Sequence, residues 1–591
     1  MNANSLIQLF IYIGLVLLLS WPVGLYISRV FENANRLLGS EGRVTRLLHA
    51  VENGIYRLAG VDPKQEMDWM GYTVSLLVFN LLGALLLYSI LRLQDWLPLN
   101  PQHFHAVPST TAFNTAVSFM TNTNWQSYSG ETTLSIFAQM VGLTVQNFVS
   151  AATGLCIAIV LIRSFARESQ KFLGNFWVDL TKTTLYILLP AALILAVLLM
   201  SQGVIQNFQG VKQVDLLHPV TLVRGHHQIR LIHQILPMGP VASQEAIKQL
   251  GTNGGGYFNM NSAHPFENPS PLSNFLAMVA MLLFPAATCI AFGEMIGDRR
   301  QGWAILAAMT ILFVVFASGG LLAEHGSNPE LHGLPIATHA SRLQSGGNME
   351  GKEVRFGVTD SVLFNTTATA TSTGAINSTS DSYLPLGGLV PLWLMQLGEV
   401  VYGGIGSGFY GMMLFVLVAV FVAGLMVGRT PEYLGKKIET FDMKMVALGI
   451  LVTPAIILLG TAVAVLIPHA TSVLGNPGPH GFTEILYAFS SVANNNGSAM
   501  GGLTVTSTFY QVATGLAMLM GRFWFALPVM ALAGSMVMKK KIPPNLGTLP
   551  THTPLFITLL IGTVILVSAL NFLPALSLGP LIEHFILIHT H

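Results

Sequence analysis

The chain has 591 residues, of which 52% are apolar and 9% are charged, and its formal net charge is +1. Because soluble proteins carry roughly 25% charged residues, this composition indicates a membrane protein with several spans. The near-neutral charge leaves no basic surface for nucleic acid. The two cysteines, Cys156 and Cys289, lie inside apolar runs, which argues against a disulfide framework.

Ten apolar runs reach the length of about 20 residues that a helix needs to cross a bilayer. They lie near residues 6–27, 70–92, 133–163, 176–200, 275–297, 303–323, 390–427, 444–467, 508–538 and 554–576. The first run has no basic residue before it and no small-residue cleavage site after it, so we expect a retained span rather than a signal sequence.

The orientation of the spans follows from the Lys and Arg residues, which concentrate in alternate loops. These loops are near residues 29–64, 163–171, 299–300, 429–444 and 539–541. By the positive-inside rule they face the cytoplasm, and both termini lie outside.

Four short polar segments recur between the apolar runs. They are Thr121 to Gln126, Gly251 to Gly256, Thr371 to Ala375, and Ala493 to Ser498. Each follows a stretch too short to span, near 109–121, 242–250, 359–370 and 482–492, which suits a re-entrant half-helix. Irregular backbone at membrane depth is tolerated only where it is buried in protein or faces a water-filled path.

Any one of these clusters alone would be interpreted as a turn. Their starts, however, lie near residues 122, 252, 372 and 495, at intervals of 130, 120 and 123 residues. Such even spacing indicates an internal repeat. We therefore predict an all-α polytopic membrane protein with four membrane-pore-membrane repeats and one extra transmembrane helix at each end. The predicted units are 1–69 (first helix and cytoplasmic loop), 70–175, 176–301, 302–440 and 441–541 (pore repeats one to four), and 542–591 (last helix).

The four segments suit the binding of a dehydrated cation, which needs oxygen ligands such as successive backbone carbonyls. Gly254, Gly374 and Gly497 would let the backbone approach the axis, whereas the first repeat has Asn124 instead. The carboxyl ends of the half-helices would add partial negative charge. Since no Asp or Glu lies within the segments, a monovalent ion such as K⁺ is favoured.

Two further features lie inside apolar runs. Arg522 needs a partner there, and we hypothesise that it neutralises a carboxylate or a carbonyl cluster near the ion path. The run 390–427 is too long for one crossing and is rich in glycine between 398 and 408. It predicts either a discontinuous helix that gates or diverts the ion below the third segment, or close helix packing.

Histidines cluster in the polar loop 218–233 and near residue 591, without cysteine or paired carboxylates at ligand spacing, which argues against a metal site there. The chain has neither a Gly-x4-Gly-Lys-Ser/Thr phosphate loop nor an Asp-Lys-Thr-Gly-Thr phosphorylation sequence. We therefore expect no nucleotide to bind, and any uphill transport must draw on another subunit or an ion gradient.

The polar segments carry a resemblance to a known family. The stretches 121–131, 251–268 (GTNGGGYFNMNSAHPFEN) and 493–499, together with the loops 292–302 and 428–439, closely resemble the KdpA family, the potassium-binding and translocating subunits of bacterial Kdp potassium-transporting ATPases. The resemblance covers essentially the whole chain and implies the fold of the superfamily of K⁺ transporters.

By this resemblance, K⁺ is the transported ion, and the filter ligands are Asn122, Thr123 and Asn124; Thr252, Asn253 and Gly254; Ser372, Thr373 and Gly374; and Asn495, Asn496 and Gly497. Gln126 resembles a position linked to K⁺ affinity, and the third segment is the least distinctive.

The resemblance also implies partners and a location. The expected partners are a P-type ATPase subunit that hydrolyses ATP, a single-span accessory subunit, a small lipid-like peptide and membrane lipids, and the expected location is the bacterial cytoplasmic (inner) membrane. The chain itself would be a non-catalytic subunit that passes K⁺ sideways through an intersubunit tunnel to the pump. A stand-alone or gradient-coupled K⁺ channel or symporter, and a purely structural scaffold, are the alternatives.

Overall fold

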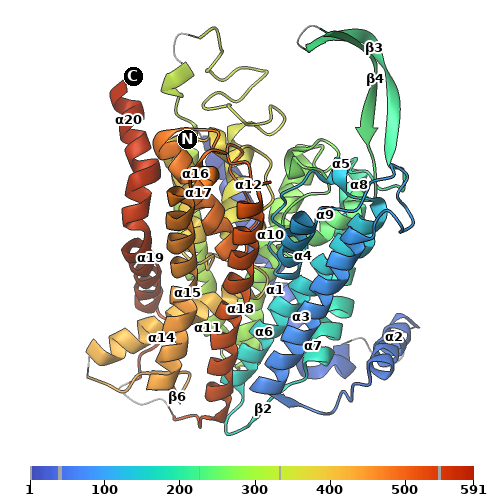
Figure 1. The fold of residues 1–591 in the computed structure, drawn as a ribbon. Helices are drawn as coiled ribbons and strands as arrows, with labels where there is room; N and C mark the ends of the chain where they lie inside the picture. The colour runs from blue at the N-terminus through green and yellow to red at the C-terminus, as the bar shows by residue number, and fades with distance from the viewer. Residues whose placement is uncertain are drawn as a thin grey trace.

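The computed structural model describes residues 3–37, 43–224, 227–331, 334–426, 428–543 and 548–590. Long helices dominate it and run roughly side by side (Figure 1). Ten helical stretches in this part of the chain are long and apolar enough to cross a membrane, which confirms the polytopic membrane fold. They are α1 (Ala3–Leu37), α3 (Trp69–Arg92), η1 (Ala138–Thr144) with α6 (Val145–Ala166), α7 (Phe176–Lys182) with η2 (Thr183–Leu188) and α8 (Leu189–Ser201), α10 (Pro271–Met295), α11 (Arg299–Glu324), α14 (Ser407–Met426), α15 (Thr440–Leu466), α18 (Thr508–Met538), and α19 (Pro554–Leu576) with η6 (Ser577–Leu581) and α20 (Ile582–Thr590).

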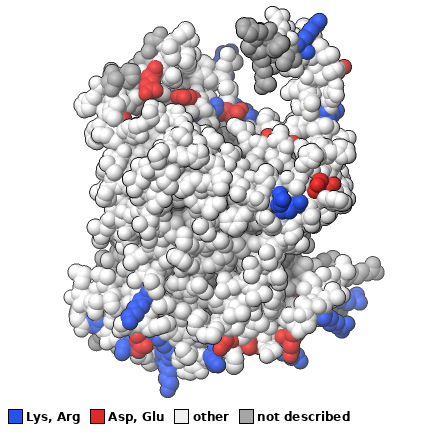
Figure 2. Space-filling model, in the orientation of Figure 1, with Lys and Arg blue, Asp and Glu red and all other residues white. Residues whose placement is uncertain are grey.

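Charged side chains gather at the two ends of the molecule. On the face in Figure 2, Lys, Arg, Asp and Glu colour the upper and lower ends, and the band between is nearly free of them. This distribution fits a hydrocarbon core around the helices, because an ionised side chain at the bilayer centre is costly. Both termini lie at the upper end, with the loops after β2 (Phe172–Gly174) and β6 (Lys436–Lys437) at the lower end (Figure 1).

Each of four pairs of spans encloses a shorter helix that cannot cross a bilayer. These are α4 (Ser109–Met120), α9 (Val241–Leu250), α12 (Gly357–Ala370) and α17 (Gly478–Ala493). They lie where the sequence predicted half-helices. In chain order the arrangement of span, short helix and span recurs four times, with α1 and α19 outside the series.

The first flanking helix packs closely against the second repeat. A Cβ atom added to Gly24 of α1 would lie 2.7 Å from the Ala287 carbonyl oxygen, so only glycine permits this approach to α10. Tyr12, also on α1, donates a hydrogen bond of 2.9 Å to the Met278 carbonyl. Small residues at such crossings are typical of helix packing in membranes.

The apolar run 390–427 is not one span. α13 (Pro385–Gln396) ends before residues 397–406, which form a buried non-helical loop, and α14 then begins at Ser407. Positive φ angles at Gly398, Glu399, Tyr402, Gly403 and Gly406 prevent helix continuation. The discontinuous helix is therefore confirmed. We call residues 397–406 the broken-helix loop.

One β-hairpin was not predicted. β3 (Val211–Arg224) pairs antiparallel with β4 (His227–Pro237), and the hairpin projects from the upper end (Figure 1). The helical class is confirmed, yet this segment lies beyond the spans, where water satisfies strand edges and β-branched residues favour pairing. The 17-residue helix α2 (Arg43–Ala59) follows α1 in the chain. The remaining elements are short: α5 (Gly130–Thr133), α16 (Pro468–Thr471), η3 (Asn261–Ala263), η4 (Pro329–Leu331), η5 (Ser380–Ser382), β1 (Met67–Asp68) and β5 (Glu432–Tyr433).

At the lower end a buried lysine joins the repeats. The Lys436 Nζ atom donates to the carbonyl oxygens of Ser164 at 2.6 Å and Met536 at 2.7 Å, and also to that of Arg167. Its side chain is fully buried. Because the last carbonyls of a helix lack intrahelical donors, this ammonium group satisfies the ends of both α6 and α18.

We predict that Lys436→Met lowers the free energy of unfolding by about 3 kcal/mol, since the buried Ser164 carbonyl and the part-buried Arg167 carbonyl lose this donor and the Met536 carbonyl loses one of two. Lys437→Met is the matched control, because Lys437 is exposed. Denaturant titration of the purified chains in detergent measures the free energy of unfolding of each variant. Equal stability of the two variants would contradict the structural role of Lys436.

Candidate functional site: a ring of four filter segments

The four polar segments lie in the interior, directly after the carboxyl ends of α4, α9, α12 and α17. Their middle residues are fully buried: Thr123, Asn253, Thr373 and Asn496 all have 0% exposure. The short helices direct the negative ends of their dipoles toward the same region, which favours a cation there.

The backbone follows the same pattern in each segment. Positive φ angles occur at two positions that flank the middle residue: Asn122 and Asn124, Thr252 and Gly254, Ser372 and Gly374, and Asn495 and Gly497. Only glycine, and occasionally asparagine, adopts this conformation readily. Thr252 and Ser372, which are neither glycine nor asparagine, therefore hold strained backbone, which proteins retain mainly at functional sites.

A shared hydrogen bond fixes each segment to its own short helix. The middle N–H donates to the carbonyl five residues earlier. The four bonds are Thr123 to Ser118 at 2.9 Å, Asn253 to Lys248 at 2.9 Å, Thr373 to Ala368 at 3.0 Å, and Asn496 to Ser491 at 2.8 Å. The N–H groups are thus satisfied by the helices behind them, which leaves carbonyl oxygens available toward the centre.

The segments surround a common centre in the order one, two, three, four. A Cβ atom added to Gly254 would collide with the Thr373 carbonyl oxygen, one added to Gly374 with that of Asn496, and one added to Gly497 with that of Thr123. The ring is closed between segments one and two, where Asn124 Nδ2 donates a hydrogen bond of 2.8 Å to the Gly254 carbonyl. Main-chain oxygens from neighbouring segments therefore converge, as in a carbonyl-lined ion filter.

The first segment differs from the others because its side chains support the second. Asn122 Nδ2 donates to the Thr252 carbonyl at 3.1 Å. Gln126 donates to the Gly256 carbonyl at 2.8 Å and accepts from the Gly256 N–H at 2.9 Å. Gln126 therefore joins the two segments above the ring. This contact gives a physical reason for a link between this side chain and ion affinity, a role that stays a prediction.

A buried ion-pair cluster stabilises the second segment. Lys248 on α9 donates to the Gly255 carbonyl at 2.6 Å, to Glu267 at 2.7 Å, and also contacts Glu245. All three charged side chains are at least 97% buried. Since an unpaired buried charge is strongly destabilising, these residues hold one another and the loop in place.

The broken-helix loop supports two of the strained positions. The Ile405 N–H donates to Thr252 Oγ1 at 2.8 Å, and the Ser372 hydroxyl contacts the Glu399 carboxylate. The Gly403 N–H also donates to the Ala370 carbonyl at 2.9 Å. As an ionisable residue in an apolar run, Glu399 is a functional candidate from the sequence, but the sequence did not indicate its contact with Ser372.

A cavity of about 50 Å³ lies below the ring. Such a volume holds a few water molecules. Its lining includes Asn122, Ser372 and Asn495 from the segments, Glu399 from the broken-helix loop, and Arg522 from α18. Residues of α15 and residues 567–572 of α19 also line it, so it reaches from the ring to a flanking helix.

Arg522 is 8% exposed and crosses from α18 to α6, where its guanidinium donates to the Ser150 carbonyl at 3.3 Å. The carbonyl partner agrees with one half of the hypothesis for this residue. The hypothesis that Arg522 neutralises a carboxylate or a carbonyl cluster near the ion path stays a prediction.

Of the twelve predicted ligands, the structure brings together all four groups of three around one centre. The fold and this ring define the class: a polytopic membrane protein in which span, short helix and span recur four times around a ring of buried main-chain carbonyl groups. The family described as "KdpA: Potassium-transporting ATPase A subunit" matches residues 10–585, and the chain belongs to this family.

Relatives agree over the full length. The "Potassium-transporting ATPase potassium-binding subunit" of Sorangium cellulosum is 57% identical over 584 residues, covering 99% of both chains. That of Ralstonia nicotianae is 55% identical, covering 99% of this chain and all of the other. The potassium transporter TrkH from Vibrio parahaemolyticus is a more distant structural neighbour, with a TM-score of 0.49, 15% identity, and coverage of 89% of this chain and 98% of that one.

We predict that Gly254→Ala lowers the apparent K⁺ affinity at least about 100-fold, or about 2.7 kcal/mol, because the new methyl group displaces the Thr373 carbonyl. Gly562→Ala is the control, since an added Cβ there meets no atom within 4 Å. The K⁺ concentration for half-maximal uptake, in cells that lack other K⁺ importers, is the measurement. Unchanged affinity in correctly assembled Gly254→Ala protein would contradict the filter assignment.

Proposed function

We propose that this chain selects K⁺ in the ring of four segments and passes it, below the ring, to a partner subunit that hydrolyses ATP. The convergence of main-chain oxygens at Gly254, Gly374 and Gly497 carries the proposal. Carbonyl oxygens replace the hydration shell of the ion, and the neutral cage suits a monovalent cation.

The proposed ligands are the carbonyl groups of the twelve residues named for the four segments. The left-handed backbone at Thr252 and Ser372 supports this assignment, because residues of these types adopt it only at an energetic cost. Gln126 is proposed to tune affinity by setting the distance between the first and second segments.

The cavity below the ring supports a sideways route. It extends from Asn122 and Ser372 to Ser568 on the flanking helix α19. The broken-helix loop lies beside it, and we propose that this loop diverts the ion away from the axis. The buried Glu399 carboxylate would stabilise the cation there, and Arg522 would limit how many ions the cavity holds.

The partners and the location follow from the same proposal. The relatives named as potassium-binding subunits imply a separate ATPase subunit. We propose a P-type ATPase, a single-span accessory subunit and a small lipid-like peptide as partners. We further propose the bacterial inner membrane, with the upper end outside, because the basic loops lie at the other end.

The test of the proposed function is reconstitution. The chain goes into lipid vesicles alone, or with the ATPase subunit encoded beside it, recognisable by its Asp-Lys-Thr-Gly-Thr sequence. We expect ATP-dependent K⁺ accumulation only when both are present, since the chain has no nucleotide motif. Passive K⁺ flux through the chain alone would instead support a channel or symporter.

We predict that Arg522→Gln reduces the coupling between ATP hydrolysis and K⁺ transport about 10-fold, since the cavity loses its fixed positive charge. The two rates are measured on the reconstituted complex. Arg230→Gln, an exposed residue on β4, is the control. Full transport by the Arg522→Gln complex would remove Arg522 from the ion path.

A further inference from the structure

An acidic pocket opens at the upper end, away from the filter ring. Its volume is about 420 Å³, and carboxylates of Glu330, Glu350, Asp381 and Glu583 line it. His480 is the one basic side chain in this lining among the described residues. Clefts lined by charge of one sign raise the local concentration of the opposite ion, so this pocket attracts cations.

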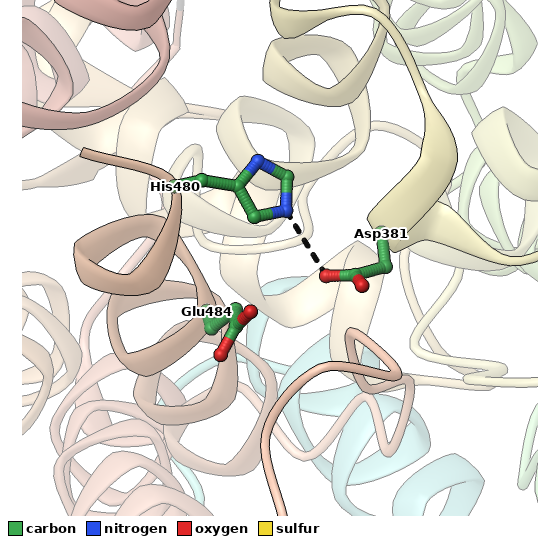
Figure 3. Close-up of side chains that lie close together, drawn as sticks. All are labelled: Asp381, His480 and Glu484. Carbon is green, nitrogen blue, oxygen red and sulfur yellow. Dashed lines mark hydrogen bonds and ion pairs between the residues drawn. The ribbon is translucent and has the colours of Figure 1, made fainter. Parts of the chain in front are cut away.

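Three possible metal ligands lie close together beside this pocket, and two of them, Asp381 and His480, line it. Asp381 lies in η5, just after the third filter segment, and His480 and Glu484 lie one turn apart on α17. One ligand atom from each lies within 4.8 Å of the others (Figure 3). The separation of His480 Nε2 from Asp381 Oδ1 is 3.1 Å, which is close enough for both atoms to contact a single ion.

The Glu484 side chain gives a second, independent indication that a cation binds here. The side chain is fully buried, and Oε1 accepts a hydrogen bond of 2.8 Å from Asn476. Oε2, however, has no hydrogen-bond partner among the described residues. In Figure 3 the carboxylate lies on the same side of α17 as His480, close to Asp381. A buried carboxylate oxygen without a partner is costly, and a bound cation removes that cost.

The orientation of His480 matches that of a metal-binding imidazole. Its Nδ1 atom lies 2.7 Å from Glu583 Oε1 on α20. Histidine ligands usually donate their second ring N–H to a carboxylate, which fixes the ring and the tautomer. Nε2 lies 3.1 Å from Asp381 Oδ1, so a metal ion that replaces the Nε2 proton would contact both atoms.

We propose that Asp381, His480 and Glu484 bind a divalent transition-metal ion of the Zn²⁺ class, with Glu583 as the positioning residue for His480. One imidazole and two carboxylates form a ligand set that zinc accepts, and a fourth position opens to the pocket for water. Mg²⁺ and Ca²⁺ prefer oxygen ligands alone, so the nitrogen favours the transition metal.

In the metal-free chain a proton takes the place of the ion. Burial opposes the charged imidazole, but the hydrogen bonds to Asp381 and Glu583 outweigh it and raise the pKa of His480 to about 10. Metal binding therefore has to release this proton. A site that holds only the proton is the competing explanation, and it predicts no specific metal uptake.

A bound ion would join three elements that are distant in sequence. It would connect η5, which follows the third filter segment, to the outer end of α17, whose carboxyl end leads into the fourth segment. Through Glu583 it would also fix the terminal helix α20. The ion would thus restrain two of the four repeats at the mouth of the filter.

The test uses the full-length chain in detergent, stripped of metal with a chelator and titrated with Zn²⁺. We expect one Zn²⁺ per chain in excess of that bound by His480→Ala. We expect at least about 10-fold weaker binding in Glu484→Gln and about 10-fold to 100-fold weaker binding in Glu583→Gln. His469→Ala, a substitution of an exposed histidine on α16, should bind as the unchanged chain does.

Equal Zn²⁺ stoichiometry and affinity in the unchanged chain and in Glu484→Gln would overturn the proposal, because this substitution keeps the shape of the side chain. A circular-dichroism melting curve of each variant checks that it is folded. X-ray absorption at the zinc edge should show one nitrogen and two carboxylate oxygens as protein ligands. A shell of several histidines would place the ion elsewhere and reject the site. Since these measurements require no transport, they are independent of the proposed potassium function.

Discussion

The structure depends on main-chain carbonyl oxygens that are directed at a shared centre deep in the protein. Such groups are costly at membrane depth unless water, an ion or a donor satisfies them. Four short helices solve half of the problem, because each accepts the N–H of the middle residue that follows it, as Ser118 does for Thr123. The carbonyl oxygens of the segments then face a common centre.

Holding this cage requires support from far along the chain. Thr252 and Ser372 occupy left-handed backbone conformations that their side chains disfavour. Both are in contact with the broken-helix loop, through Ile405 and Glu399. The loop and the filter are therefore mechanically connected: a change in one alters the strain in the other. This connection joins the ring of segments to the cavity lined by the broken-helix loop.

Much of this architecture is readable from local sequence. Apolar run length gave the ten spans and the four short helices, and recurrent Gly and Asn gave the filter segments. The break in 390–427 was ambiguous, because glycine between 398 and 408 suits both a break and close packing. The contacts of Lys436, of Glu399, and of His480 with Asp381 and Glu583 were beyond reach. They join residues of different elements, and no local periodicity reports such pairs.

All four segments lie on one polypeptide, so the ring that they form can be asymmetric. In a homotetramer every side chain appears four times around the axis, so an arginine at the position of Arg522 would bring four like charges together. Here Arg522, Glu399 and Gln126 each occur once, in different quadrants. A ring with unequal quadrants can let an ion leave on one side only. A strictly fourfold-symmetric ring cannot.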